Sequence, residues 1–353
     1  MINKTKVLVV DDSSLFRQMI ITHLSEQKDI EVVGYAINAY DAQRKIPLLK
    51  PDVLTLDVEM PGLSGIDFLK QLLPTHPIPV ILVSSLNLSV FDALSAGAVD
   101  FVRKPDMSAH NTKDLFFSSL TTKIRGAIKA KVRISRQPGT SPGVRPQVPS
   151  RPMPFPPLPR TVLDSTIIAL GASTGGTEAT LAVLEKLPAG MPGIVITQHM
   201  PEGFTNMYAE RLNRICSLEV REAKNGDIIK PGLALIAPGA KQMEVVRSGY
   251  NYTVQCRPGA KVSGHCPSVD VLFSSVAKSA GRDAVGVILT GMGGDGAKGL
   301  LEMRKAGAIT IGQNEASCVV YGMPKVAYDI GAVQYQMELS AIANKVYGVL
   351  KPN

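Results

Sequence analysis

The chain has 353 residues, enough for two domains of ordinary size, and its 45% hydrophobic and 19% charged residues are globular values. No apolar run approaches the roughly 20 residues that a membrane-spanning helix needs. The N-terminus lacks a signal-peptide cleavage pattern, so we expect a cytoplasmic protein without membrane insertion, and a monomer as the default. Four cysteines without a CxxC pair favour free thiols over a zinc site.

The net charge of +8 is concentrated in one segment. Residues 111–160 contain 10 basic and 1 acidic side chains, whereas residues 1–110 contain 10 and 13. No aromatic or recognition-helix pattern accompanies the basic segment. We therefore interpret it as a solvated helix and linker, and we expect no nucleic-acid partner.

Five apolar, β-branched runs recur in the first 130 residues. They lie at 6–10, 30–36, 53–57, 79–85 and 100–104, and segments with helical spacing separate them. Continuous apolar runs are typical of strands covered on both faces. The pattern predicts a five-stranded parallel, flavodoxin-like domain over residues 1–130, with ligands bound at the carboxyl ends of its strands.

Polar side chains follow the ends of these strands. Asp11 and Asp12 follow the first strand and Asp57 ends the third. Three converging carboxylates repel one another, so this arrangement indicates a divalent cation such as Mg²⁺. Lys104 can offset anionic charge there, and Ser84 can donate a hydrogen bond to a phosphoryl group.

These polar residues and the strand pattern make residues 1–125 resemble the receiver domain of two-component response regulators. The resemblance implies a histidine kinase as phosphodonor and a phosphorylated aspartate that responds through switch positions. The implied residues are Asp57 as phospho-acceptor, Asp11, Asp12 and Asp57 as Mg²⁺ ligands, and Ser84, Phe101 and Lys104 as switch positions.

A change of composition marks a domain boundary. Residues 135–160 contain nine prolines, four arginines and no acid. Such a segment cannot bury enough apolar surface to fold by itself, so we expect an extended spacer. We place a Pro/Arg-rich linker at 131–160.

Residues 161–353 return to alternating strands and helices. We expect a second doubly wound α/β domain, hydrolytic in function, with a small antiparallel element around 243–256. The expected strands are 165–171, 193–198, 233–237, 284–290 and 307–312, and the expected helices are about 176–187, 203–214, 268–280 and 296–306.

Ser173 lies in the turn between the first strand and helix of this domain. Backbone N–H groups at a helix start have no internal partner and favour negative charge, so an oxyanion beside Ser173 would be stabilised. A simple helix cap explains the fragment equally well. The decision depends on whether a base lies nearby.

Two histidines of this domain are candidate bases. His199 directly follows a strand, where Ser173 also sits, whereas His265 lies in a loop; we favour His199. Asp295 follows another strand and opens a helix. Ser, His and Asp at the ends of three parallel strands can converge into a nucleophilic triad. No GxSxG elbow is present, so this would be a separate solution to the same chemistry.

A rival interpretation rests on the same region. Residues 291–296 also satisfy GxGxxG, and Glu315 lies nineteen residues beyond Gly296. This spacing fits a dinucleotide fingerprint, although the motif comes late in the domain rather than at its first strand. Nucleotide binding therefore stays the less favoured alternative.

Four motifs in order, GASTGG (171–176), TQHMP (197–201), GHCPSVD (264–270) and TGMGGDG (290–296), give residues 161–350 a second resemblance. They resemble the catalytic domain of the chemotaxis protein-glutamate methylesterases and glutamine deamidases, the CheB family, whose architecture also includes a receiver. The resemblance implies chemoreceptor glutamate methyl esters as substrate and no cofactor for the hydrolytic step. The implied residues are Ser173, His199 and Asp295 as the triad, with the N–H groups of Thr174 and Met292 at the oxyanion.

The order of the domains suggests regulation. A receiver packed over the esterase cleft would exclude a bulky helical substrate, and phosphorylation of Asp57 would weaken that packing through Ser84 and Phe101. Two alternatives stay open. The second domain could bind a partner or nucleotide without hydrolysis, or it could be a related esterase with another substrate.

Overall fold

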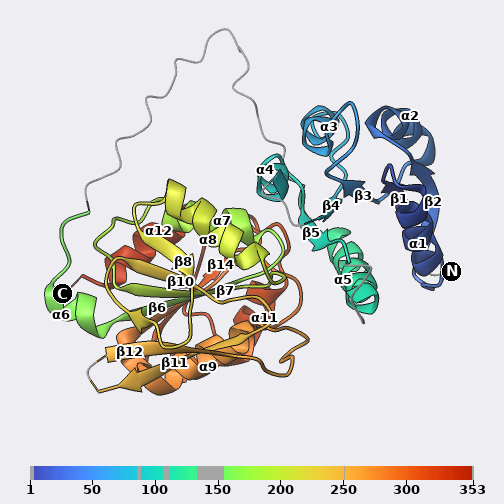
Figure 1. Cartoon of the computed structure of the whole chain (residues 1–353). Helices are drawn as coiled ribbons and strands as arrows, with labels where there is room; N and C mark the ends of the chain where they lie inside the picture. The colour runs from blue at the N-terminus through green and yellow to red at the C-terminus, as the bar shows by residue number, and fades with distance from the viewer. Residues whose placement is uncertain (1–3, 86–88, 106–111, 133–154, 250, 352–353) are drawn as a thin grey trace, which may run out of the picture. The chain divides into compact units, whose positions relative to one another are not determined.

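The computed structural model describes residues 4–85, 89–105, 112–132, 155–249 and 251–351 (Figure 1). The chain divides into two compact units, residues 1–139 and 140–353. Their boundary, and most of the predicted linker, falls within 133–154, outside the described residues. Within the described ranges, no helix combines the length and apolar character needed to cross a membrane.

The first unit contains a five-stranded parallel sheet in the order β2-β1-β3-β4-β5, as the sequence predicts. Residues 7–10 of β1 are fully buried because neighbouring strands and helices cover the strand on all sides. Since β1 lies beside β3, the residues that end these two strands meet at one edge. The elements are β1 (Thr5–Val10), α1 (Ser14–Ser25), β2 (Ile30–Ala36), α2 (Ala39–Leu49), β3 (Val53–Asp57), α3 (Gly65–Leu72), β4 (Val80–Ser84), α4 (Ser89–Ser95), β5 (Asp100–Arg103) and α5 (Thr112–Ala127).

The second unit is built on a seven-stranded parallel sheet in the order β15-β14-β13-β6-β7-β10-β8. Helices lie against this sheet in Figure 1, which agrees with the expected α/β class. The strands are β6 (Ile167–Ala172), β7 (Gly193–Gln198), β8 (Glu219–Glu222), β10 (Leu233–Ile236), β13 (Ala284–Ile288), β14 (Ile309–Gln313) and β15 (Tyr335–Met337). The helices are α6 (Arg160–Ser165), α7 (Gly176–Leu184), α8 (Phe204–Ile215), α9 (Val269–Ser279), the 3₁₀ turn η1 (Gly281–Asp283), α10 (Ala297–Lys305), α11 (Met323–Asp329) and α12 (Leu339–Val349).

A small antiparallel sheet decorates this unit where the sequence predicts one. It consists of β9 (Ile228–Ile229), β11 (Gln242–Ser248) and β12 (Asn251–Arg257) in the order β11-β12-β9. Its buried face, including Met243 and Val254, packs into the same core as Phe273 of α9. The small sheet therefore supports α9, whose first residues belong to the site described below.

The described end of the predicted linker packs onto the second unit. The ring of Phe155 lies 4.3 Å from that of Tyr347 on α12, Tyr347 Oη donates to the carbonyl of Pro156, and Leu158 is buried. The proline content of this stretch is typical of a spacer, but its aromatic and aliphatic side chains supply apolar surface that α12 can cover.

Candidate active site

Three adjacent strands of the second unit bring the predicted triad to one edge. Strands β6 and β7 pair so that Ala172 lies opposite Gln198, and Ser173 and His199 are the next residues on each. The His199 N–H donates to the Ala172 carbonyl at 3.1 Å. On the other side, the Ser173 N–H donates to the carbonyl of Thr290, beyond β13, at 3.0 Å. Ser173 thus follows β6, the strand that lies between β7, which leads to His199, and β13, which leads towards Asp295.

Two buried side chains donate hydrogen bonds to the backbone of the turn that contains Ser173. Gln198 Nε2 donates to the Ser173 carbonyl at 2.8 Å, and Thr290 Oγ1 donates to the Thr174 carbonyl at 3.0 Å. Gly175 has φ +75°, a conformation that L side chains rarely adopt. The backbone beside Ser173 is held in one conformation, as a nucleophile requires.

His199 and Asp295 form a short hydrogen bond. His199 Nε2 lies 2.7 Å from Asp295 Oδ2, and the two side chains are only 7% and 1% exposed. An ionised carboxylate only accepts, so the neutral ring carries its proton on Nε2 and keeps its lone pair on Nδ1. In the part of the chain that the structure describes, Nδ1 has no hydrogen-bond partner. Nδ1 is therefore the ring nitrogen that can accept a proton.

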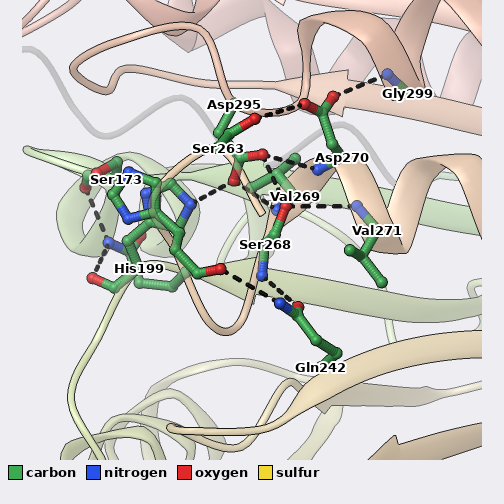
Figure 2. A network of polar contacts seen from close by, with 12 residues as sticks. Ser173, His199, Gln242, Ser263, Ser268, Val269, Asp270, Val271, Asp295 and Gly299 are labelled. Carbon is green, nitrogen blue, oxygen red and sulfur yellow. Dashed lines mark hydrogen bonds and ion pairs between the residues drawn. The ribbon is translucent and has the colours of Figure 1, made fainter. Parts of the chain in front are cut away.

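Asp295 is surrounded by donors from the start of α9 (Figure 2). Ser268 Oγ and the Val269 N–H each donate to it at 2.7 Å, and the Asp270 N–H donates at 3.1 Å. Burial alone would raise the pKa of Asp295, but the hydrogen bonds from His199, Ser268 and Val269 hold that pKa below its usual value. Asp295 is therefore an ionised partner for the ring.

The two residues expected to hold an oxyanion, Thr174 and Met292, lie in the turn after Ser173 and in the loop that approaches it. A Cβ at Gly291 would lie 2.8 Å from Ser173 Cβ, so only glycine lets this loop approach so closely. Met292 follows directly, and within the described ranges its N–H has no acceptor. Thr174, the other expected donor, is buried at the start of the turn that leads into α7.

The glycines of residues 291–296 differ in the space around them, and a Cβ at Gly293 would meet nothing within 4 Å. A Cβ at Gly291 would also lie 2.3 Å from Met323 Sδ, and one at Gly296 would lie 2.4 Å from a methyl group of Val269. These glycines are close to side chains of the protein itself. They allow the loop to pack against Ser173 and α9, where Asp295 of the same loop is bonded to His199 and Val269.

In the first unit, the predicted carboxylates converge. Ligand oxygens of Asp11, Asp12 and Asp57 lie within 4.8 Å of one another, and Lys104 Nζ lies 2.6 Å from Asp57 Oδ2 and 3.2 Å from Asp11 Oδ2. Burial raises the pKa of Asp11 and Asp57 although the Lys104 ammonium opposes it. One lysine does not offset three acids, so this all-oxygen cluster fits a hard divalent cation such as Mg²⁺.

The predicted switch positions Ser84 and Phe101 lie on the neighbouring strands β4 and β5. Ser84 is the last residue of β4, and its fully buried hydroxyl has no partner in the described ranges. Phe101 on β5 is 2% exposed, with its ring 6.5 Å from that of Phe91 on α4. A hydroxyl without a partner and a ring packed against α4 suit residues that would change place on phosphorylation.

Sequence reasoning missed the residues that support the triad. It singled out TQHMP and GHCPSVD as motifs but gave no role to Gln198, Ser268 or Gln242. Ser268 is the N-cap of α9, and its position before an apolar helix could have identified it as a cap. Nothing in the sequence indicated that the same side chain also donates to Asp295.

Both units match known families. Residues 168–346 match the family model described as CheB methylesterase, and residues 7–113 match the response regulator receiver domain. The chain is 52% identical over 350 residues to protein-glutamate methylesterase/protein-glutamine glutaminase 2 of Syntrophomonas wolfei subsp. wolfei, covering 99% of this chain and 98% of that protein. It is 46% identical over 348 residues to the protein-glutamate methylesterase/protein-glutamine glutaminase of Salmonella typhi, covering 98% and 96%.

A solved structure agrees with these matches. The crystal structure of the Thermotoga maritima CheB methylesterase catalytic domain superposes with a TM-score of 0.52 at 33% identity, covering 52% of this chain and 98% of that one. The similarity to the curated relatives extends over nearly the full length of both partners, receiver included. The chain therefore belongs to the protein-glutamate methylesterase/protein-glutamine glutaminase family.

Proposed function

We propose that this protein hydrolyses glutamate methyl esters on chemoreceptors, and deamidates receptor glutamines, with Ser173 as nucleophile. The hydrogen bond between His199 and Asp295 beside Ser173 carries this proposal, because it supplies an oriented base. The family membership supplies the substrate class and the link to chemotaxis.

The mechanism follows from the ring nitrogens of His199. Nδ1 takes the proton of Ser173 as Oγ attacks the ester carbonyl, and the N–H groups of Thr174 and Met292 bind the oxyanion. The imidazolium then protonates the departing methoxide, which leaves as methanol. Water repeats the sequence on the acyl-enzyme and releases glutamate. Asp295 stays ionised and stabilises the imidazolium. For glutamine substrates ammonia leaves instead.

No hydrogen bond joins Ser173 Oγ to the His199 ring in the described, ligand-free chain. Catalytic hydrogen bonds are often long without substrate and shorten in the reactive complex. Both residues follow paired strands, and the mechanism requires Ser173 Oγ to come within hydrogen-bond distance of His199 Nδ1 when substrate is bound.

We infer that the first unit regulates hydrolysis by the second unit. A histidine kinase would phosphorylate Asp57, with Mg²⁺ held by Asp11, Asp12 and Asp57 to offset the charge of the incoming phosphoryl group. Lys104, already at Asp57, would then hold a phosphoryl oxygen. The protein would act as a monomer in the cytoplasm, where receptor methylation sites and the kinase are accessible.

A non-hydrolytic, nucleotide-binding output domain is not favoured, because the second unit matches the CheB methylesterase family model and Asp295 of the 291–296 loop is bonded to His199. The direct test is methanol release from methylated receptor membranes by the wild type and by Ser173→Ala. We expect the substitution to reduce kcat by a factor of about 10⁴ or more without loss of folding. Equal release by both proteins would reject Ser173 as the nucleophile.

A further inference from the structure

A second histidine lies face to face with the proposed base. The ring centroids of His199 and His265 are 3.6 Å apart and the planes differ by only 8°. His265 belongs to the loop between β12 and α9, far from His199 in the sequence. The sequence offered these two histidines as alternative bases, and the structure stacks one on the other.

The loop that carries His265 is fixed from several sides. His265 and Val262 exchange both backbone hydrogen bonds at 2.9 Å. Gln242 Nε2 donates to the His265 carbonyl at 3.2 Å, and Gln242 Oε1 accepts from the Ser268 N–H at 2.8 Å, a link visible in Figure 2. These bonds fix the backbone of His265, the residue whose ring stacks on His199.

The same loop also holds the other partner of the base. Ser268, three residues after His265, donates to Asp295 Oδ1, and Val269 donates to Asp295 Oδ2. One continuous segment therefore sets the carboxylate at the edge of the His199 ring and an aromatic surface against its face.

His199 needs such a surface. In the described chain its ring makes a single hydrogen bond, from Nε2 to Asp295, and a ring held at one atom can tilt about that contact. A flat ring at van der Waals distance blocks the tilt. In addition, His199 becomes a cation when it takes a proton, and an aromatic face beside a cation stabilises it.

We propose that His265 is a positioning residue, which holds the His199 ring in its reactive plane through stacking and transfers no proton itself. This inference rests on the proposed mechanism of Ser173, His199 and Asp295. A flat aromatic ring is the required property, so phenylalanine should replace His265 and leucine, of similar size but not aromatic, should not.

The test compares His265→Phe with the matched His265→Leu in the full-length chain. We measure kcat and KM for methanol release, the rate at which phenylmethanesulfonyl fluoride modifies Ser173, and the thermal midpoint. For leucine we expect kcat and the modification rate to fall about tenfold, with KM within twofold. For phenylalanine we expect both rates within about threefold of the wild type.

Three results would overturn the proposal. Equal losses in both variants at unchanged thermal midpoints would mean that the imidazole itself takes part in the chemistry. Wild-type rates in both variants would mean that stacking is irrelevant. Rates that follow a lowered thermal midpoint in both would indicate a structural role only.

If the proposed Ser173 mechanism is wrong, the measurements would differ from those that reject the role of His265. In that case the reagent would modify the wild type no faster than Ser173→Ala, whatever residue occupies position 265. A wild type that is modified at Ser173 but releases no methanol would reject the substrate and leave the stacking test valid through the modification rate.

Discussion

The two nitrogens of the His199 ring have different surroundings. Nε2 faces the ionised Asp295, whose hydrogen bonds to the start of α9 fix its orientation, whereas Nδ1 has no partner in the described chain. The serine proton is thus expected on Nδ1. Asp295 determines which nitrogen is available, because a carboxylate can only accept.

Removing the charge of Asp295 should therefore impair catalysis more than binding. In Asp295→Asn the amide cannot stabilise the imidazolium and can pair with either tautomer. We expect kcat to fall by a factor of about 10² to 10⁴ with little change in KM. Asp283→Asn, an exposed position on η1, is the control. A normal kcat in Asp295→Asn would remove this residue from the mechanism.

A second residue prediction concerns the receiver. Asp57 lies 2.6 Å from Lys104, beside Asp11 and Asp12, and an asparagine there accepts no phosphoryl group. Asp57→Asn should retain the basal methanol release and lose all increase on addition of the kinase and ATP. Asp67→Asn on the exposed side of α3 should respond like the wild type. Kinase-dependent activation of Asp57→Asn would place the phosphorylation elsewhere.

At the scale of elements, the N-terminus of α9 depends on Asp295. The carboxylate accepts from Val269 and Asp270, the first N–H groups of the helix, and from its N-cap Ser268. A negative charge at this end is favourable because the N–H groups lack helical partners and carry positive partial charge. Catalysis and the stability of α9 therefore depend on the same ionised group.

The lowered pKa of Asp295 predicts how the unfolding free energy changes with pH. The pKa of Asp295 in the folded protein is below its usual value of 3.8. Its contribution to stability is therefore complete above about pH 4 and is lost as the pH falls through the folded pKa. We expect the difference in unfolding free energy between wild type and Asp295→Asn to narrow below pH 4, measured by urea unfolding. A difference that is constant down to pH 2.5 would contradict this.

The elements themselves were largely predictable. The five apolar runs of the first unit correspond to β1 to β5, because strands buried on both faces need continuous β-branched residues. The hairpin of β11 and β12 also lies where predicted. The short strands β8, β9 and β15 and the helices α6, α11 and α12 were missed, since short or peripheral elements depend on tertiary contacts more than on local pattern.

The sequence predicts which residues of the site lie together after the ends of parallel strands, but not the contacts that loops make with them. Residues after parallel strands meet at one edge, which places Ser173 beside His199 and Asp11 beside Asp57. The sequence could not indicate that His265 stacks on His199 or that α9 donates to Asp295, because both contacts are set by the path of a loop. Such contacts have no periodic signal.

At the scale of the whole molecule, one chain contains a phosphorylation site and a hydrolytic site in separate compact units. Phe155 and Pro156 contact Tyr347 of α12, so this stretch belongs to the second unit. We expect the fragment 155–353 to release methanol from receptor membranes without a kinase, at least as fast as the unphosphorylated full chain. A folded fragment that is inactive would argue against inhibition by occlusion.

Starting the fragment at residue 161 provides the matched comparison. This shorter fragment loses Leu158, which is buried, and Phe155, whose ring lies against that of Tyr347 on α12. We expect a lower thermal midpoint, by several degrees, and unchanged kcat at low temperature, since α12 packs mainly against α7 and β14 rather than against the loops that hold the proposed triad.

The most direct test of the account is methanol release by the full-length chain from methylated receptor membranes, with and without acetyl phosphate plus Mg²⁺. We expect slow release that rises at least severalfold with the phosphodonor, and no such rise in Asp57→Asn. Release that is absent under both conditions, from a protein whose Ser173 reacts with phenylmethanesulfonyl fluoride, would contradict the proposed substrate. Release that is the same with and without phosphodonor would contradict the proposed switch.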